Sequence, residues 1–89
     1  MRDLAELRGE IDALDSDLAR LFRHRLKVVD KIASVKRESG ALVCDSGREA
    51  EILARVAVEA GEGYAEDVCR LFASIFDISR ARQLEAMAN

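Results

Sequence analysis

Residues 3–39, DLAELRGEIDALDSDLARLFRHRLKVVDKIASVKRES, decide the fold of this chain. Apolar side chains recur alternately three and four residues apart along this stretch, and that heptad spacing predicts one long amphipathic helix. Asp3 can cap its start, Gly40 can end it, and no proline interrupts it. The seam consists of Leu4, Leu7, Ile11, Leu14, Leu18, Leu21, Arg25, Val28, Ile32 and Val35.

The length of this helix predicts a second copy of the chain. About 36 residues at about 1.5 Å each give a rod of about 54 Å. A compact chain of 89 residues would be only about 30 Å across. The rod is longer than such a globule, so we expect an intertwined homodimer in which the partner covers the overhang.

Composition places the chain in the all-α class. It is 49% hydrophobic and 35% charged and has no proline or tryptophan, as helical bundles do. The net charge of −3 gives no reason to expect nucleic acid as a partner. No apolar run is long enough to cross a membrane and the N-terminus does not resemble a signal peptide, so we expect a cytoplasmic protein. Cys44 and Cys69 lack metal-ligand spacing and are interpreted as small apolar residues, not as a disulfide.

Two shorter helices are predicted after the first. Ser46 and Glu49 match a capping box that would start the second helix, and the glycines of 61–63 would end it. The third helix is expected over about 64–86, and residues 1–89 are expected to form a single domain with three helices. The predicted buried face of the third helix consists of Val68, Leu71, Phe72, Ile75 and Phe76.

Arg25 is the one charged residue of the long seam. A buried unpaired charge costs several kcal/mol, so it needs an anionic partner, either a carboxylate of the chain or a ligand. Lys36 lies three turns later, within about 20° of the same face and about 16 Å along the axis, so both side chains could converge on a ligand. Arg8 lies about 26 Å from Arg25 and points about 100° away. One copy cannot direct both arginines at a small molecule, but in an antiparallel or intertwined dimer Arg8 of the partner chain could close the pocket.

Two polar residues of the third helix continue an apolar row. Ser79 and Gln83 follow Phe72 and Phe76 at helical spacing, so they either need buried partners or lie where the helix becomes exposed. The first turn of the second helix adds three further charged side chains, Asp45, Arg48 and Glu49.

Together these residues resemble the all-helical chorismate mutases in their short three-helix bacterial form. The polar positions are in register across all three helices, which is far more specific than a single Arg-x-x-Ile-Asp. The motifs are Leu7-Arg8-x-x-Ile11-Asp12-x-Leu14-Asp15, Arg25, Lys36, Asp45-x-x-Arg48-Glu49, Arg70-Leu71-Phe72 and Ser79-x-x-x-Gln83.

The resemblance implies an intramolecular Claisen rearrangement of chorismate to prephenate, on the route to phenylalanine and tyrosine. Such a reaction needs no covalent intermediate, metal or cofactor. By resemblance, Arg25 and the other subunit's Arg8 hold the two carboxylates, and Lys36 and Gln83 act as the catalytic donors to the ether oxygen. Glu49 takes the substrate hydroxyl. The remaining pocket residues would be Asp45, Arg48 and Ser79.

Three alternatives remain open from the sequence. An isochorismate–pyruvate lyase shares the fold and several of the cations, although the motif over 45–49 together with Ser79 is more like the mutases. A non-catalytic helical dimerisation or effector-binding module would not need Arg25, Lys36 or Gln83. The chain could also be one domain of a longer polypeptide, since such mutases are often fused to the next enzymes of the pathway.

Overall fold

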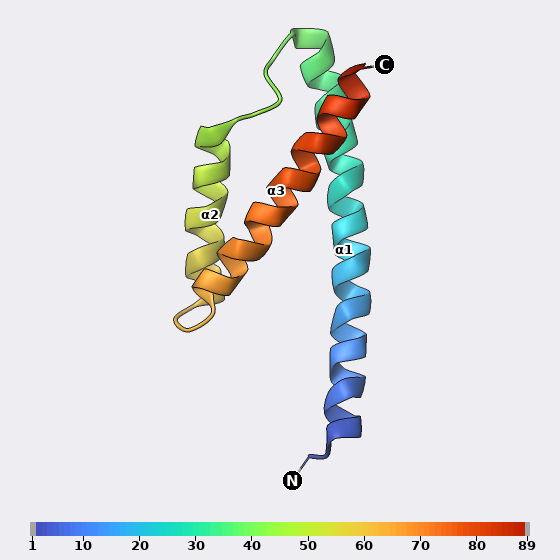
Figure 1. The fold of residues 1–89 in the computed structure, drawn as a ribbon, viewed down its shortest axis with the longest axis vertical. Helices are drawn as coiled ribbons and strands as arrows, with labels where there is room; N and C mark the ends of the chain where they lie inside the picture. Colours follow the sequence, from blue (N-terminus) through green and yellow to red (C-terminus); the bar gives the residue numbers. More distant parts are fainter. Residues whose placement is uncertain (1, 89) are drawn as a thin grey trace.

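A computed structural model describes residues 2–88 as three helices joined by two short connections (Figure 1). These are α1 (Leu4–Ser39), α2 (Ser46–Ala60) and α3 (Ala65–Ala88). The described residues contain no strand, which confirms the predicted all-α class with a very long first helix. The third helix begins at Ala65 and ends at Ala88, so it is displaced slightly from the predicted range.

Both ends of α1 follow from local chemistry. The Asp3 carboxylate accepts a hydrogen bond of 2.9 Å from the backbone N–H of Glu6, one of the amides that the first turn leaves unpaired. Gly40 adopts the left-handed conformation with φ of 74°, which costs glycine no steric strain, and its N–H donates to the carbonyl of Lys36. The predicted bounds of the helix are therefore confirmed.

Helix α3 is the central element, because it packs against both α1 and α2. In Figure 1 it runs diagonally from the turn after α2 to the C-terminal end of α1. Phe76 of α3 forms the main apolar cluster with two residues of α2, Ile52 and Val56. On the α1 side the buried residues are Val29 and Ala33, which lie beside the seam and not in it.

The seam itself remains open to solvent in the single chain. Its nine apolar side chains are 42–64% exposed, and Figure 1 shows the N-terminal half of α1 standing clear of the other helices. The molecule measures 57 × 26 × 14 Å and has a radius of gyration of 16.3 Å. A compact chain of this length would have a radius of gyration of about 12 Å. The single chain is therefore elongated, and the homodimer expected from the length of the helix stays a prediction.

Two local predictions are wrong. The cap of α2 is Asp45, whose Oδ1 accepts from the backbone N–H of Arg48 at 3.0 Å, and Ser46 is already the first helical residue. A carboxylate carries a full negative charge, which the positive end of a helix favours over a neutral hydroxyl. Leu71 is 49% exposed, because its neighbour Phe72 occupies the face directed at the cluster and one residue turns a helix by about 100°.

The cysteine prediction is partly confirmed. Both thiols are free, so no disulfide joins them. Cys69 is half-buried, and its Sγ lies 3.8 Å from the carbonyl oxygen of Leu53. Cys44 lies exposed in the connection before α2, so it contributes nothing to the apolar core.

A bidentate ion pair fastens α3 to α1. Arg82 Nε and Nη2 donate to the two oxygens of Asp30 at 2.6 and 2.9 Å. The hydrogen bonds from Arg82 hold the pKa of Asp30 below its usual value, so the pair stabilises the fold at neutral pH. This contribution is lost as pH falls through the lowered folded pKa.

Asp30→Asn should therefore lower Tm modestly at neutral pH, since half-exposed pairs contribute little. The difference in Tm from wild type should shrink toward zero as the pH is lowered below about 4, the ordinary pKa of an aspartate. Thermal unfolding followed by circular dichroism over a pH series measures this. An unchanged difference between neutral and acidic pH would contradict the assignment.

Candidate active site

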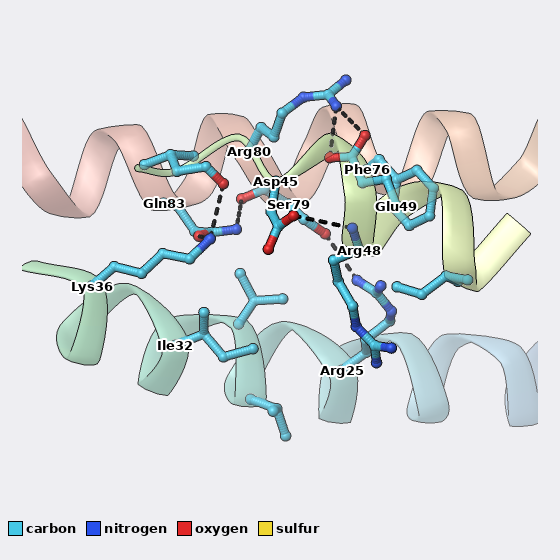
Figure 2. A pocket seen from close by; sticks show the side chains of 14 residues that line it. Arg25, Ile32, Lys36, Asp45, Arg48, Glu49, Phe76, Ser79, Arg80 and Gln83 are labelled. Atoms are coloured by element: carbon cyan, nitrogen blue, oxygen red, sulfur yellow. Dashed lines mark hydrogen bonds and ion pairs between the residues drawn. The ribbon is translucent and has the colours of Figure 1, made fainter. Parts of the chain in front are cut away.

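A pocket of about 380 Å³ lies where the C-terminal half of α1, the first turns of α2 and the C-terminal half of α3 meet. This volume is within the range of small-molecule sites. Figure 2 shows its charged side chains converging from the three helices and the connection before α2. The lining consists of Arg25, Val28, Val29, Ile32, Lys36, Val43, Asp45, Arg48, Glu49, Ile52, Phe76, Ser79, Arg80 and Gln83.

Seven of the eight residues predicted for the site line this one pocket. The exception is Arg8, which lies on the exposed N-terminal half of α1, about 26 Å along the helix from Arg25. The sequence indicated the same separation. A single chain therefore brings together the set Arg25, Lys36, Asp45, Arg48, Glu49, Ser79 and Gln83, and leaves out Arg8.

Arg25 is held by a neutral partner. Its Nη1 donates to Ser79 Oγ at 2.9 Å, and that hydroxyl donates in turn to the carbonyl of Ile75 at 2.7 Å. No carboxylate among residues 2–88 forms an ion pair with Arg25. Burial and the nearby positive charge of Arg48 lower the pKa of Arg25, as expected for a cation that lacks an anion. Of the two partners expected for Arg25, a carboxylate is therefore not found among residues 2–88, and a ligand remains the expected anion.

Lys36 and Gln83 form a second polar unit. Lys36 Nζ donates to the carbonyl of Val43 at 2.9 Å and to Gln83 Oε1 at 3.1 Å. Because an ammonium group can only donate, the atom of the Gln83 amide that Lys36 contacts must be the oxygen. The NH₂ group of Gln83 therefore points away from Lys36. Gln83 Nε2 donates to the carbonyl of Ser79 at 3.3 Å. After these bonds, Lys36 and Gln83 each retain one N–H for a ligand.

Ser79 and Gln83 are only 6% and 7% exposed. Both are buried polar residues with partners, so they do not mark a surface-exposed end of α3. Their burial beside Phe76 explains why polar residues continue an apolar row: the row faces the pocket. Of the two alternatives left open by the sequence, the one with buried partners is therefore correct and the exposed helix end is wrong.

The first turn of α2 brings three charged groups to the pocket wall. Asp45 caps the helix, which fixes its carboxylate against the backbone N–H of Arg48. The guanidinium of Arg48 lies 3.5 Å from Glu51, an exposed neighbour on the same helix, so this pair is weak and leaves the arginine available. Glu49 points toward α3 (Figure 2).

The pocket contains one charged residue that the sequence analysis missed. Arg80 of α3 donates from Nη1 to both oxygens of Glu49 at 2.6 and 2.8 Å. It also contacts Asp77, and hydrogen bonds to Glu49 and Asp77 raise the pKa of Arg80 above its usual value. The sequence could have indicated Arg80 as a pocket residue, because it follows Phe76 by four residues and therefore lies on the same face of the helix.

The charges of the pocket leave an excess of positive charge. Its lining holds four cationic groups, Arg25, Lys36, Arg48 and Arg80, against the two carboxylates of Asp45 and Glu49. The chain as a whole has a net charge of −3. A concave site with a net charge of +2 in an acidic protein attracts a small anion locally and selects against cations.

The fold and the site define a class: an all-helical protein with a cationic pocket between its helices. Residues 7–84 match the model of the family described as chorismate mutase type II, and the chain belongs to that family. A T-protein from Haemophilus influenzae is 36% identical over 77 residues, which cover 81% of this chain. This chain spans only 20% of the length of that relative. No solved structure matches the chain.

Proposed function

We propose that this protein catalyses the rearrangement of chorismate to prephenate. The observation that carries the proposal is the state of Arg25, a pocket arginine without a carboxylate partner among residues 2–88, opposite the donor pair of Lys36 and Gln83. Chorismate is a dianion, and the net charge of +2 on the pocket lining complements it. Membership of the chorismate mutase type II family supports the same reaction.

The two substrate carboxylates would be held by guanidinium groups. Arg25 takes one of them, and the donation from its Nη1 to Ser79 Oγ fixes the direction in which its fork opens. Arg8 of a second copy takes the other. Bidentate forks restrain a carboxylate in two directions, which holds the flexible substrate in a compact chair with its reacting carbons close together. Arg48, whose guanidinium lies near that of Arg25, adds positive charge from α2.

The ether oxygen would lie against Lys36 and Gln83. Negative charge develops on this oxygen as the carbon–oxygen bond lengthens, and fixed donors stabilise that charge more than they stabilise the ground state. Lys36 is anchored by the carbonyl of Val43 and Gln83 by the carbonyl of Ser79, so neither donor must reorient during the reaction. Together with substrate alignment, this could account for about a millionfold acceleration, or about 8 kcal/mol.

The substrate hydroxyl would donate to the carboxylate of Glu49. Asp45 supports the same part of the pocket, because its cap fixes the start of α2 and with it the backbone at Arg48 and Glu49. No proton is transferred in this scheme. The pocket acts by alignment and by fixed charge.

The active unit would be a homodimer, with residues 1–89 as one mutase domain in each chain. The nine apolar seam residues of α1 are 42–64% exposed, and a continuous apolar stripe of that length is costly in water. A second α1 with the same seam matches it in length and period. If the two α1 helices pack antiparallel, Arg8 of one chain would come beside Arg25 of the other and complete the pocket.

No described helix is long and apolar enough to cross a membrane. We propose the cytoplasm as the location of the enzyme.

A subunit-mixing experiment tests the shared pocket. Arg8→Ala and Arg25→Ala proteins should each be nearly inactive, and refolding them together should restore activity. Each heterodimer has one pocket with both lesions and one intact pocket, so random pairing predicts about a quarter of wild-type activity. Heterodimers separated from this mixture by affinity tags should show about half of wild-type activity with chorismate, because one of their two pockets is intact. Continued inactivity after verified exchange would show that the pocket does not use both chains.

The activity itself is tested by adding chorismate to purified protein and following the loss of its diene absorbance. Prephenate should be the only product, identified by chromatography, and isochorismate should not be cleaved. Release of pyruvate from isochorismate would favour the lyase. No reaction with either substrate would favour a binding module.

A further inference from the structure

We propose that Arg80 is a positioning residue, which holds the carboxylate of Glu49 in the orientation that accepts the substrate hydroxyl. The inference rests on the proposed function and adds to it a residue that does not touch the reacting atoms. The two side chains come from different helices, Glu49 from the first turn of α2 and Arg80 from the C-terminal half of α3. Their meeting point is the pocket wall seen in Figure 2.

The contact fixes the carboxylate in position and in rotation. One nitrogen of Arg80, Nη1, lies 2.6 Å from one oxygen of Glu49 and 2.8 Å from the other, so it bridges the carboxylate. The other nitrogen, Nη2, is taken by Asp77 of the preceding turn. Asp77 on the same helix therefore fixes the Arg80 guanidinium, while Arg80 binds Glu49 of α2. A glutamate without such a brace would sample several rotamers.

The held carboxylate can still bind a ligand. Two carboxylate oxygens offer about four acceptor positions, and the bridge to Arg80 uses one on each oxygen. A hydroxyl can therefore donate to Glu49 without displacing Arg80. The arginine also compensates the negative charge of Glu49, which would otherwise repel a dianionic substrate at short range. The Arg80–Glu49 pair therefore offers the substrate hydroxyl an acceptor whose negative charge is largely neutralised.

A purely structural role makes a different prediction. If Arg80 only fastens α2 to α3, its loss would reduce the folded fraction and leave the substrate contacts of the remaining protein intact. The chain offers a matched control in Arg82, which lies two residues later on the same helix. Arg82 forms a bidentate pair with Asp30 of α1 and does not line the pocket.

The experiment is a double-mutant cycle on the full chain with chorismate as substrate. The variants are Arg80→Gln, Glu49→Gln, the double variant and the control Arg82→Gln, each measured for kcat, KM and Tm. Arg80→Gln should lower kcat/KM at least about tenfold, as expected for losing a charged hydrogen-bond partner, and should raise KM. The double variant should be within about threefold of Glu49→Gln, because Arg80 acts through Glu49. Arg82→Gln should keep wild-type kcat/KM.

Several outcomes would overturn the proposal. Wild-type kinetics in Arg80→Gln, or losses of Arg80 and Glu49 that multiply in the double variant, would show that Arg80 does not act through Glu49. A lower kcat with unchanged KM and lower Tm would assign it a structural role. If Arg80→Gln does not fold, the cycle is run with Arg80→Lys, which keeps the charge but cannot bridge both oxygens while also reaching Asp77. A severalfold loss that disappears in the Glu49→Gln background is then expected.

The experiment distinguishes failure of the proposed function from failure of the proposed role of Arg80. Inactive wild-type protein would refute the proposed function, and the proposed role of Arg80 with it. Active wild type with an uncoupled Arg80 would refute only the positioning role and leave the reaction assignment intact.

Discussion

Arg25→Lys should lower kcat/KM for chorismate by about a hundredfold or more while the protein stays folded. Lysine retains the charge but replaces a planar fork with a single ammonium group, so a carboxylate is no longer held at two points. Misplacing the substrate by about 1 Å can cost a hundredfold in rate. The hydrogen bond from Arg25 Nη1 to Ser79 Oγ would also be lost or lengthened, so Ser79 would no longer orient the side chain at position 25.

The matched control is Arg23→Lys, the same substitution two residues earlier at an exposed position outside the pocket. Initial rates over a range of chorismate concentrations, with circular dichroism to verify folding, would compare the two variants. The control should have wild-type kinetics. If Arg25→Lys turned over at a similar rate, Arg25 would supply charge only, and its role in aligning the substrate would have to be given up.

Features set by short-range chemistry could be predicted from the sequence. The ends of α1 depend on a carboxylate at Asp3 and a left-handed glycine at Gly40, both recognisable from residue type. Arg25 and Lys36 share a face because a helix has a fixed period. The convergence of these residues with Ser79 and Gln83 came instead from a family resemblance across three helices, since periodicity does not place one helix against another.

Features that depend on contacts between helices were harder to predict. Arg80 lies on the same helix face as Phe76, but nothing local indicates that a residue 31 positions earlier, Glu49, meets it. Leu71 was assigned to the core because apolar residues usually are, yet the single chain leaves it half exposed. The cap of α2 was misplaced by one residue, since Asp45 and Ser46 are both good caps and only the backbone geometry separates them.

The exposed seam of α1 supports the proposed homodimer. Its spacing predicts packing, yet the packed residues of α1 are Val29 and Ala33 beside it. One face of α1 therefore packs against α3, and the apolar side chains of the other face remain 42–64% exposed among the described residues. Because Arg8 lies on the part of α1 beyond the other helices, the cover and the missing site residue would come from the same place, a second α1.

Gln83→Glu should convert an enzyme with little pH dependence into one that works only in acid. The Gln83 amide can donate to the ether oxygen at any ordinary pH, while its oxygen accepts from Lys36 Nζ at 3.1 Å. An ionised glutamate in this place would still pair with Lys36 but would have no hydrogen to donate, and its charge would oppose the charge developing on the ether oxygen. At neutral pH, loss of such a donor should cost about 10²- to 10³-fold in kcat.

Lowering the pH should restore much of this activity, because a protonated glutamate donates as the amide does. The reference pKa of glutamate is about 4.3; burial in this pocket would raise it and the charge of Lys36 would lower it. The direction of the profile is therefore fixed: kcat rises as the pH falls. Gln83→Ala is the control, since it lacks the donor at every pH and should be slow with no recovery in acid. Equal kcat for Gln83→Glu and wild type at neutral pH would show that Gln83 does not face the breaking bond.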